Sequence, residues 1–180
     1  MKRIIVSFAA LSLLGAQQSR REVVSPSKNP QDDSRPNRNS VPDVYAVNTK
    51  FSRVVLLRFK YDTDLLAGLE KMVKEEKIGN AVFLSALGSV RNYQVHQVSN
   101  RTFPSKDVFV KDPSAPADIV GIGGYVLNGR IHAHITLANA DGAFGGHLEP
   151  GTNVFTFAVL TLGVLEGDLE LSRLDDKTFR

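Results

Sequence analysis

Residues 118–148 read DIVGIGGYVLNGRIHAHITLANADGAFGGHL and contain two consecutive hairpin signals. The apolar runs at 118–126 and 130–138 flank Leu127-Asn128-Gly129, and Asn-Gly favours a tight turn between antiparallel strands. A second turn signal, Asn139-Ala140-Asp141-Gly142, follows the second run. The stretch therefore predicts antiparallel strands joined by short turns.

One helix and several further strands are expected around this stretch. A β-rich apolar run within 52–60 predicts a buried strand, and apolar residues at helical spacing predict a helix over 64–77. Asp64 is suited to cap this helix, and Gly79 is expected to provide its left-handed stop. Other strands are expected at 81–87, 90–98, near Val108, 154–162 and 168–172. The predicted fold class is α+β: a mainly antiparallel β-sheet covered by one main α-helix.

Composition and charge limit the classes of function. The chain has 180 residues, enough for one domain with a substantial core, and no Cys, which excludes disulfides and Cys-ligated metals. Of its 22 Lys or Arg and 19 Asp or Glu, residues 1–50 hold eight and four, which leaves 14 basic and 15 acidic residues in 51–180. This later part lacks the net positive charge typical of nucleic-acid binding, so binding to DNA is not favoured.

The N-terminal 50 residues differ in character from the rest. A basic start at 1–3 and an apolar run over 4–16 are typical of a signal peptide, although an N-terminal core helix or strand is the alternative. The run is too short to span a bilayer comfortably, so no stable membrane span is expected after cleavage; an uncleaved leader would tether the protein to the membrane. Residues 17–50 are Pro-interrupted and polar, which predicts a flexible linker before the domain at 51–180. We expect an exported protein, periplasmic or secreted.

Three histidines are predicted to meet on one face of the sheet. His132 and His134 are two residues apart on a strand and so point to the same side. A two-residue loop at Ala140-Asp141, or a four-residue loop over 139–142, would pair His134 with His147. A two-residue loop at Asp141-Gly142 would instead shift His147 one step along the strand, on the same face. An odd-length loop, or a bulge at Gly145-Gly146, would turn it away. Three imidazoles with an open fourth position favour zinc, although nickel or copper would also bind, and a pair of ordinary half-buried histidines is the alternative.

Other polar residues near this group are given simpler roles. His96 is interpreted as an ordinary strand histidine, and Asp141 as a turn residue. Glu149 has the same strand parity as His147 and could face the site. Hydrolysis by a zinc-bound water would require a general base close to the metal. We therefore predict a binding site in preference to a catalytic site.

Several segments resemble one known family, the plant-and-prokaryote conserved domain (PPC, also DUF296), over residues 51–180. The similarity is most specific in Gly129-Arg130-Ile131-His132-Ala133-His134-Ile135 and in the following Asp141-to-Leu148 segment. It extends to Leu57-Arg58-Phe59, to the segment 83–90 around Gly88, and to Ser172-Arg173-Leu174-Asp175-Asp176. The resemblance implies a homotrimeric α+β domain whose His132, His134 and His147 hold a metal, commonly zinc.

The chain departs from the family in two respects. It has no AT-hook, the element that binds AT-rich DNA in plant members and accounts for the family's DNA-binding label. It also reads Phe157-Ala158-Val159-Leu160 where the family often has an acidic residue. Both faces of strand 154–162 are mostly apolar, so each is expected to be covered, by the helix or by a neighbouring subunit.

Three hypotheses for function follow from these observations. The leading one is an exported homotrimer that binds a metal, with zinc favoured by the three-histidine ligand set, and that also binds an unknown small ligand. The alternatives are a DNA-binding protein and a zinc-dependent hydrolase.

Overall fold

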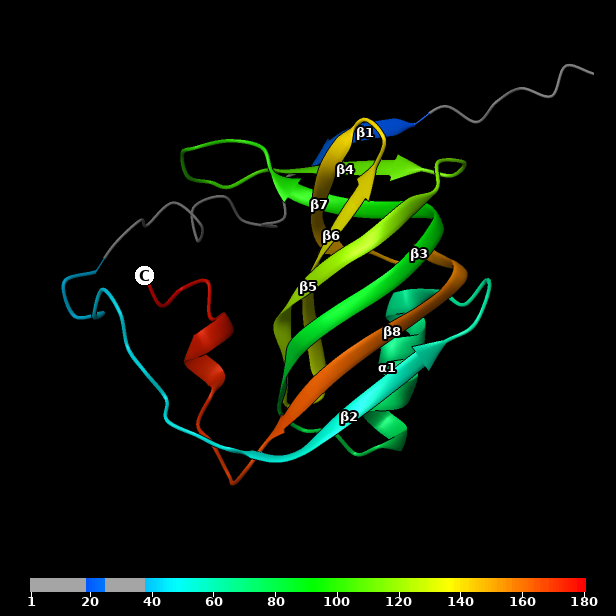
Figure 1. The fold of residues 1–180 in the computed structure, drawn as a ribbon. Coiled ribbons are helices and arrows are strands. Elements are labelled where there is room, and N and C mark those ends of the chain that lie inside the picture. Colours follow the sequence, from blue (N-terminus) through cyan, green and yellow to red (C-terminus); the bar gives the residue numbers. More distant parts are fainter. Residues whose placement is uncertain (1–18, 25–37) are drawn as a thin grey trace, which may run out of the picture.

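The computed structural model describes residues 19–24 and 38–180, and its strands form one antiparallel sheet (Figure 1). In chain order the elements are β1 (Arg20–Val24), β2 (Phe51–Phe59), α1 (Leu65–Glu75), β3 (Ala81–Val98), β4 (Asp107–Asp112), β5 (Ala117–Leu127), β6 (Arg130–Asn139), β7 (Gly142–Leu148), β8 (Asn153–Leu165) and the 3-10 helix η1 (Ser172–Asp175). Over the described residues, this arrangement confirms the predicted α+β class, with a mostly antiparallel sheet and one α-helix.

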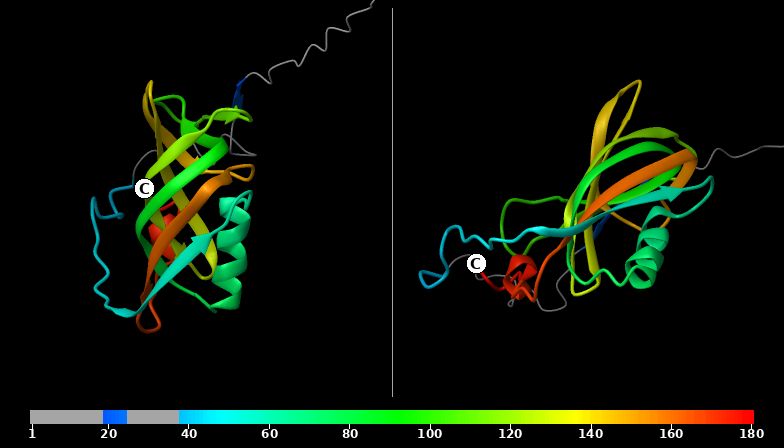
Figure 2. Two further views of the ribbon diagram at one scale, coloured as in Figure 1. Left: turned by 45° about the vertical axis from the view of Figure 1, so that its right-hand side comes forward. Right: turned by 60° about the horizontal axis from the view of Figure 1, so that its bottom comes forward.

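The long strand β3 organises the sheet. The strand order is β1-β4-β3-β5-β6-β7, and β8 pairs with both β2 and β3. The first part of β3 pairs with β5 and β8, and its last part pairs with β4 and β7. Because β7 returns to β3 at Val95↔Leu148 and His96↔His147, strands β3, β5, β6 and β7 close into a ring of paired strands. The resulting curvature is visible in both views of Figure 2.

Helix α1 packs its apolar stripe into the core. Asp64 caps it, since Oδ1 accepts a hydrogen bond from the Ala67 amide at 3.0 Å, and Leu65, Leu69 and Val73 are buried. The predicted stop at Gly79 is wrong, because the left-handed residue is Lys77, with φ of 52°. The chain reverses two residues earlier so that Ile78 can enter the core and donate from its amide to the Val73 carbonyl at 2.8 Å.

Two strand predictions need correction. The expected pair of strands at 81–87 and 90–98 is one continuous strand, β3, because Gly88 (φ of 134°) lets the backbone pass close to β8, and the pairing continues beyond it with a shift in register. The strand expected at 168–172 is absent from the described structure. Gly167, with φ of 86°, turns the chain after β8, and the chain then forms η1 instead of adding to the sheet.

The predicted linker contains a strand. Residues 20–24 form β1, which pairs antiparallel with β4 from Arg20↔Lys111 to Val24↔Asp107, so the prediction of no regular structure is wrong there. The edge of β4 supplies hydrogen-bonding partners that the local composition does not reveal. The predicted leader at 1–16 lies outside the described residues. Among those described, no helix has the length and apolar character needed to cross a membrane.

Candidate metal centre

Two hairpins place the histidines. The turn at Asn128-Gly129, with both residues at positive φ, leads from β5 into β6 as predicted. The loop Ala140-Asp141 then joins β6 to β7 with Asn139↔Gly142 as the closing pair, which sets His134 opposite His147. This register is one of those predicted from the sequence. Asp141 lies in the turn, as expected, and its amide donates to the Asn139 side chain at 2.9 Å.

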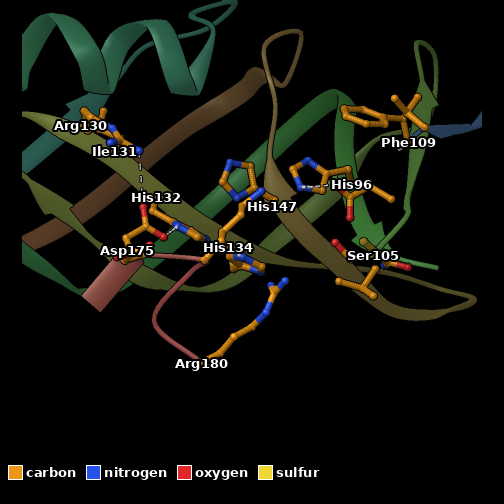
Figure 3. A pocket seen from close by; sticks show the side chains of 16 residues that line it. His96, Ser105, Phe109, Arg130, Ile131, His132, His134, His147, Asp175 and Arg180 are labelled. Carbon is orange, nitrogen blue, oxygen red and sulfur yellow. Dashed lines mark hydrogen bonds and ion pairs between the residues drawn. The ribbon is translucent and has the colours of Figure 1, made fainter. Parts of the chain in front are cut away.

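The three predicted histidines converge away from the core. Strand β6 buries Ala133 and Ile135 on one face, so His132 and His134 project from the other. Figure 3 shows their rings gathered with that of His147. The ring centroids are 4.8 to 5.3 Å apart, and one ring nitrogen from each residue lies within 4.8 Å of the other two.

The spacing of these nitrogens fits a metal ion. The Nε2 atoms of His132 and His134 are 3.2 Å apart. A tetrahedral zinc ion with Zn–N bonds of about 2.0–2.1 Å separates its ligands by roughly 3.3 Å. The spacing of this pair therefore fits one ion, and a ring nitrogen of His147 lies within 4.8 Å of both as a third ligand atom.

A carboxylate fixes one of the three rings. Asp175, in η1, places Oδ1 2.9 Å from Nδ1 of His132, and the hydroxyl of Tyr125 donates to the same oxygen at 3.1 Å. The second carboxylate oxygen lies 3.7 Å from Nη2 of Arg130. With Nδ1 donating to Asp175, His132 presents the lone pair of Nε2 to the group.

The environment of His134 and His147 keeps these two rings uncharged. Burial, followed by the neighbouring His96, His132 and His134, lowers the pKa of His147 to about 4. Burial, followed by the charge of His132, likewise lowers the pKa of His134. Burial and then the nearby Asp175 raise the pKa of Tyr125 to about 12, so its hydroxyl remains a donor. Neutral imidazoles are the form that binds a metal.

His96 belongs to this cluster, so its interpretation as an ordinary strand histidine is wrong. It lies opposite His147 across β3 and β7, and the two rings stack with centroids 4.5 Å apart. Its Nδ1 is 2.6 Å from Oε1 of Glu149, and its other face lies against Phe109. His96, His147 and Glu149 form a second group that could hold a metal. The closure of β7 onto β3 brings them together.

The sequence offered partial signals for the carboxylates. Glu149 had the strand parity of His147, but it contacts His96 instead of completing the first group. Asp175 lay in the segment that resembled the family's closing segment, yet no spacing rule connects it to His132. Strand β8, where the family often has an acidic residue, pairs with β2 and β3, whereas the three histidines lie on β6 and β7. The carboxylates beside the rings come from other elements.

Comparison with known proteins assigns the domain. The sequence profile of the Plants and Prokaryotes Conserved (PCC) domain matches residues 47–166. This chain belongs to the PCC family. The match ends before η1, so Asp175 reaches the histidines from outside the matched part of the PCC domain.

Solved structures share the PCC fold. A plant- and prokaryote-conserved (PPC) protein of Pyrococcus horikoshii is 21% identical, with a TM-score of 0.56, over 69% of this chain and 87% of that one. The metal-containing protein AF0104 of Archaeoglobus fulgidus is 22% identical, with a TM-score of 0.55, over 69% and 88%. At these identities the likeness concerns the fold.

One curated relative extends far beyond the PCC domain. The bifunctional protein GlmU of Synechococcus sp. (strain JA-3-3Ab) is 29% identical over 111 residues, which are 61% of this chain and 17% of that protein. This chain therefore spans less than a fifth of the length of that relative.

A cavity opens over the three histidines of the PCC domain (Figure 3). Its volume is about 730 Å³. One side is formed by β3 and β4, including His96 and Phe109, and the other by Asp175, Asp176, Lys177 and Arg180 of the C-terminal segment. An ion held by the three imidazoles would thus lie beside a space large enough for a small molecule.

Proposed function

We propose that this PCC-domain protein binds one zinc ion through His132, His134 and His147, and that it acts as an exported, homotrimeric metal- and small-ligand-binding module. The observation that carries the proposal is the convergence of three imidazoles, one of them held by Asp175, beneath an open cavity. Bound there, zinc would supply a positive charge and an open coordination position for a ligand.

The donor set favours zinc among common metals. The donors are nitrogen atoms, and the chain has no thiolate to attract softer ions. Oxygen-preferring ions such as calcium and magnesium are disfavoured by a site of three imidazoles. Nε2 of His132 and of His134, with one ring nitrogen of His147, would hold the ion.

Trimer formation is proposed from an apolar surface on β2, β3 and β8. Leu56 is 71% exposed, Leu87 53%, Phe155 47% and Phe157 38%, and the last two project from β8 on the side opposite its buried residues. Arg58 packs over the ring of Phe157, with its Cζ 5.6 Å from the ring centroid. Contiguous exposed apolar residues of this size mark contact surfaces. A second and third copy of the chain would cover this face.

Export is proposed from the basic start and the apolar run at 4–16. Expression of the full chain with a C-terminal tag in a bacterial host tests it. We expect a shortened N-terminus, located by mass spectrometry, and tagged protein in the periplasmic or extracellular fraction. An intact N-terminus with all tagged protein in the cytoplasm would refute export.

Metal analysis tests the centre. The purified protein, reconstituted with zinc and then desalted, is expected to retain about one zinc per chain by elemental mass spectrometry. His132→Ala/His134→Ala should lose it, whereas the matched variant His96→Ala should keep it. Retention by the double variant together with loss in His96→Ala would assign the metal to His96, His147 and Glu149 instead.

A second candidate function is hydrolysis. The observation that favours it is Glu149, held 2.6 Å from His96 beside the ring of His147, because a carboxylate near a metal-bound water can act as a general base. The zinc-loaded protein would then hydrolyse an activated ester such as 4-nitrophenyl acetate. The rate should fall at least about 100-fold in Glu149→Gln at unchanged zinc content. A rate equal to that of free zinc in buffer would exclude this function for that ester.

A further inference from the structure

The cavity over the histidines has a wall that lies outside the matched part of the PCC domain. Four residues of the C-terminal segment line it: Asp175, Asp176, Lys177 and Arg180. Figure 3 shows Arg180 extending from this segment toward the histidines. The segment is anchored by the buried Leu171 and by the ring of Phe179, which packs edge-on against Tyr45 with centroids 5.7 Å apart. Side chains from beyond the matched part of the PCC domain therefore face the open side of the centre.

The acidic residues of the cavity are engaged by their neighbours. Asp175 contacts His132, Tyr125 and Arg130, as described above. Oδ2 of Asp107 lies 3.9 Å from Nε2 of His96. Oδ1 of Asp176 accepts hydrogen bonds from the amide and hydroxyl of Thr178, at 2.8 and 2.7 Å. The negative charges are thus held at the walls, where they are partly compensated.

The basic residues balance these acids before any metal binds. Among the described residues, Arg130, Lys177 and Arg180 line the cavity, equal in number to its aspartates Asp107, Asp175 and Asp176. The guanidinium of Arg180 lies 4.1 Å from the ring centroid of Phe103, which supports the extended side chain. A divalent cation held by three neutral imidazoles would add two positive charges to this balance. The loaded cavity would then attract an anion.

The cavity also has an apolar part. Val24, Val98, Phe109 and Ile131 line it together with the charged residues. An inorganic anion would leave these side chains uncovered, whereas an organic anion would bury its carbon atoms against them. Arg side chains suit the planar carboxylate group and the phosphate group alike.

We propose that the cavity binds a small organic anion, whose carboxylate or phosphate group faces the metal, Lys177 and Arg180 while its apolar body packs against Val98 and Phe109. This inference rests on the proposed metal site. It adds to that site the chemical class of its ligand and assigns the recognition of charge to the C-terminal segment.

Calorimetry with simple probes tests the inference. Benzoate and phenyl phosphate carry the two acid groups, benzyl alcohol is the neutral analogue, and inorganic phosphate lacks the apolar body. On the zinc-loaded protein we expect at least one aromatic anion to bind about tenfold or more tightly than benzyl alcohol. Lys177→Ala/Arg180→Ala should lower that affinity about tenfold with the zinc content unchanged. Lys60→Ala/Lys74→Ala removes the same charge away from the cavity lining and should have no effect.

The possible outcomes separate this inference from the proposed function. Full zinc binding with equal affinities for benzyl alcohol and both aromatic anions would overturn the inference and leave the metal site intact. Inorganic phosphate binding as tightly as phenyl phosphate would overturn the role of the apolar wall. If the protein binds no zinc, the proposed metal site is refuted, and the same titrations on the metal-free protein then test the anion site. An anion preference that is lost in Lys177→Ala/Arg180→Ala would still support the anion site, and no preference would overturn it.

Discussion

Nδ1 of His132 lies 2.9 Å from Oδ1 of Asp175, although the two residues are 43 positions apart in the chain. The histidine comes from β6 and the aspartate from η1, which follows the last strand. The contact fixes both the tautomer and the orientation of the ring, as carboxylates commonly do for metal-binding histidines. It makes the C-terminal segment part of the proposed metal centre.

Asp175→Asn is therefore expected to weaken zinc binding about 10- to 100-fold. The amide keeps a hydrogen-bond acceptor for Tyr125 but loses the charge that favours proton donation from Nδ1 of His132. Competition with a chromophoric zinc chelator measures the change in affinity. Asp176→Asn, on the adjacent residue, is the control and should leave the affinity unchanged. Equal affinities in both variants and the parent would show that Asp175 does not act on the metal site.

The metal-free protein should lose stability as the pH falls. The pKa of His147 is about 4 in the folded protein, against an ordinary value of 6.5. Between these values the unfolded chain takes up a proton that the folded chain does not, so unfolding becomes more favourable as the pH decreases through this window. Full stability is expected above pH 6.5. The lowered pKa of His134 acts in the same direction.

Thermal unfolding of the metal-free protein from pH 7.5 to 4.5 measures this effect. Substitution of His147 by Asn, which does not titrate, should give a shallower decrease in Tm across the window. The parent and His147→Asn should therefore differ in the slope of Tm against pH. Identical slopes would assign the acid sensitivity to other groups.

Phe157→Lys is expected to convert the proposed trimer to monomers at micromolar concentration. The new ammonium would lie beside the guanidinium of Arg58 on the surface meant to be covered, so it would add both desolvation and like-charge repulsion. Sedimentation velocity reports the mass directly. Val44→Lys, at a side chain that is 86% exposed and outside this surface, should remain trimeric. A monomeric parent would refute the trimer itself, and a trimeric Phe157→Lys would place the interface elsewhere.

Turn signals and strand alternation predicted the part of the site that the two consecutive hairpins form. The turns at Asn128-Gly129 and Ala140-Asp141, with the alternation along β6, were enough to bring His132, His134 and His147 to one face. His96 joins them only because the curved sheet closes at His96↔His147, which is a long-range pairing. Asp175 arrives from η1, beyond the segment 168–172 for which a strand was predicted.

The errors in the fold have the same origin. Residues 20–24 carry too few apolar side chains to predict a strand, yet the open edge of β4 supplies their hydrogen bonds. At Gly88 the sequence indicated an interruption, but a glycine in a positive-φ conformation kinks β3 and lets it continue. In each case the backbone conformation is determined by a paired strand that is distant in the sequence, and hydrophobic periodicity does not show which strand that is.

Two adjacent glycines of β5 offer a matched test of how closely the backbone behind His132 is packed. Gly124 has φ of 119°, and an added Cβ would overlap the carbonyl oxygen of His132 on β6. Gly123 lies beside it with no atom within 4 Å of the equivalent Cβ position. Gly124→Ala should therefore lower the free energy of unfolding by about 1–3 kcal/mol from backbone strain alone, whereas Gly123→Ala should change it by less than about 0.5 kcal/mol.

Because relief of this overlap would shift β6 at His132, Gly124→Ala should also weaken zinc binding, and Gly123→Ala should not. Urea unfolding gives the stability of each variant, and chelator competition on the folded protein gives its zinc affinity. Equal stability of the two variants would show that β6 yields to the new methyl group without cost. A destabilised Gly124→Ala with the zinc affinity of the parent would show that the ring of His132 is held by Asp175 independently of the backbone beneath it.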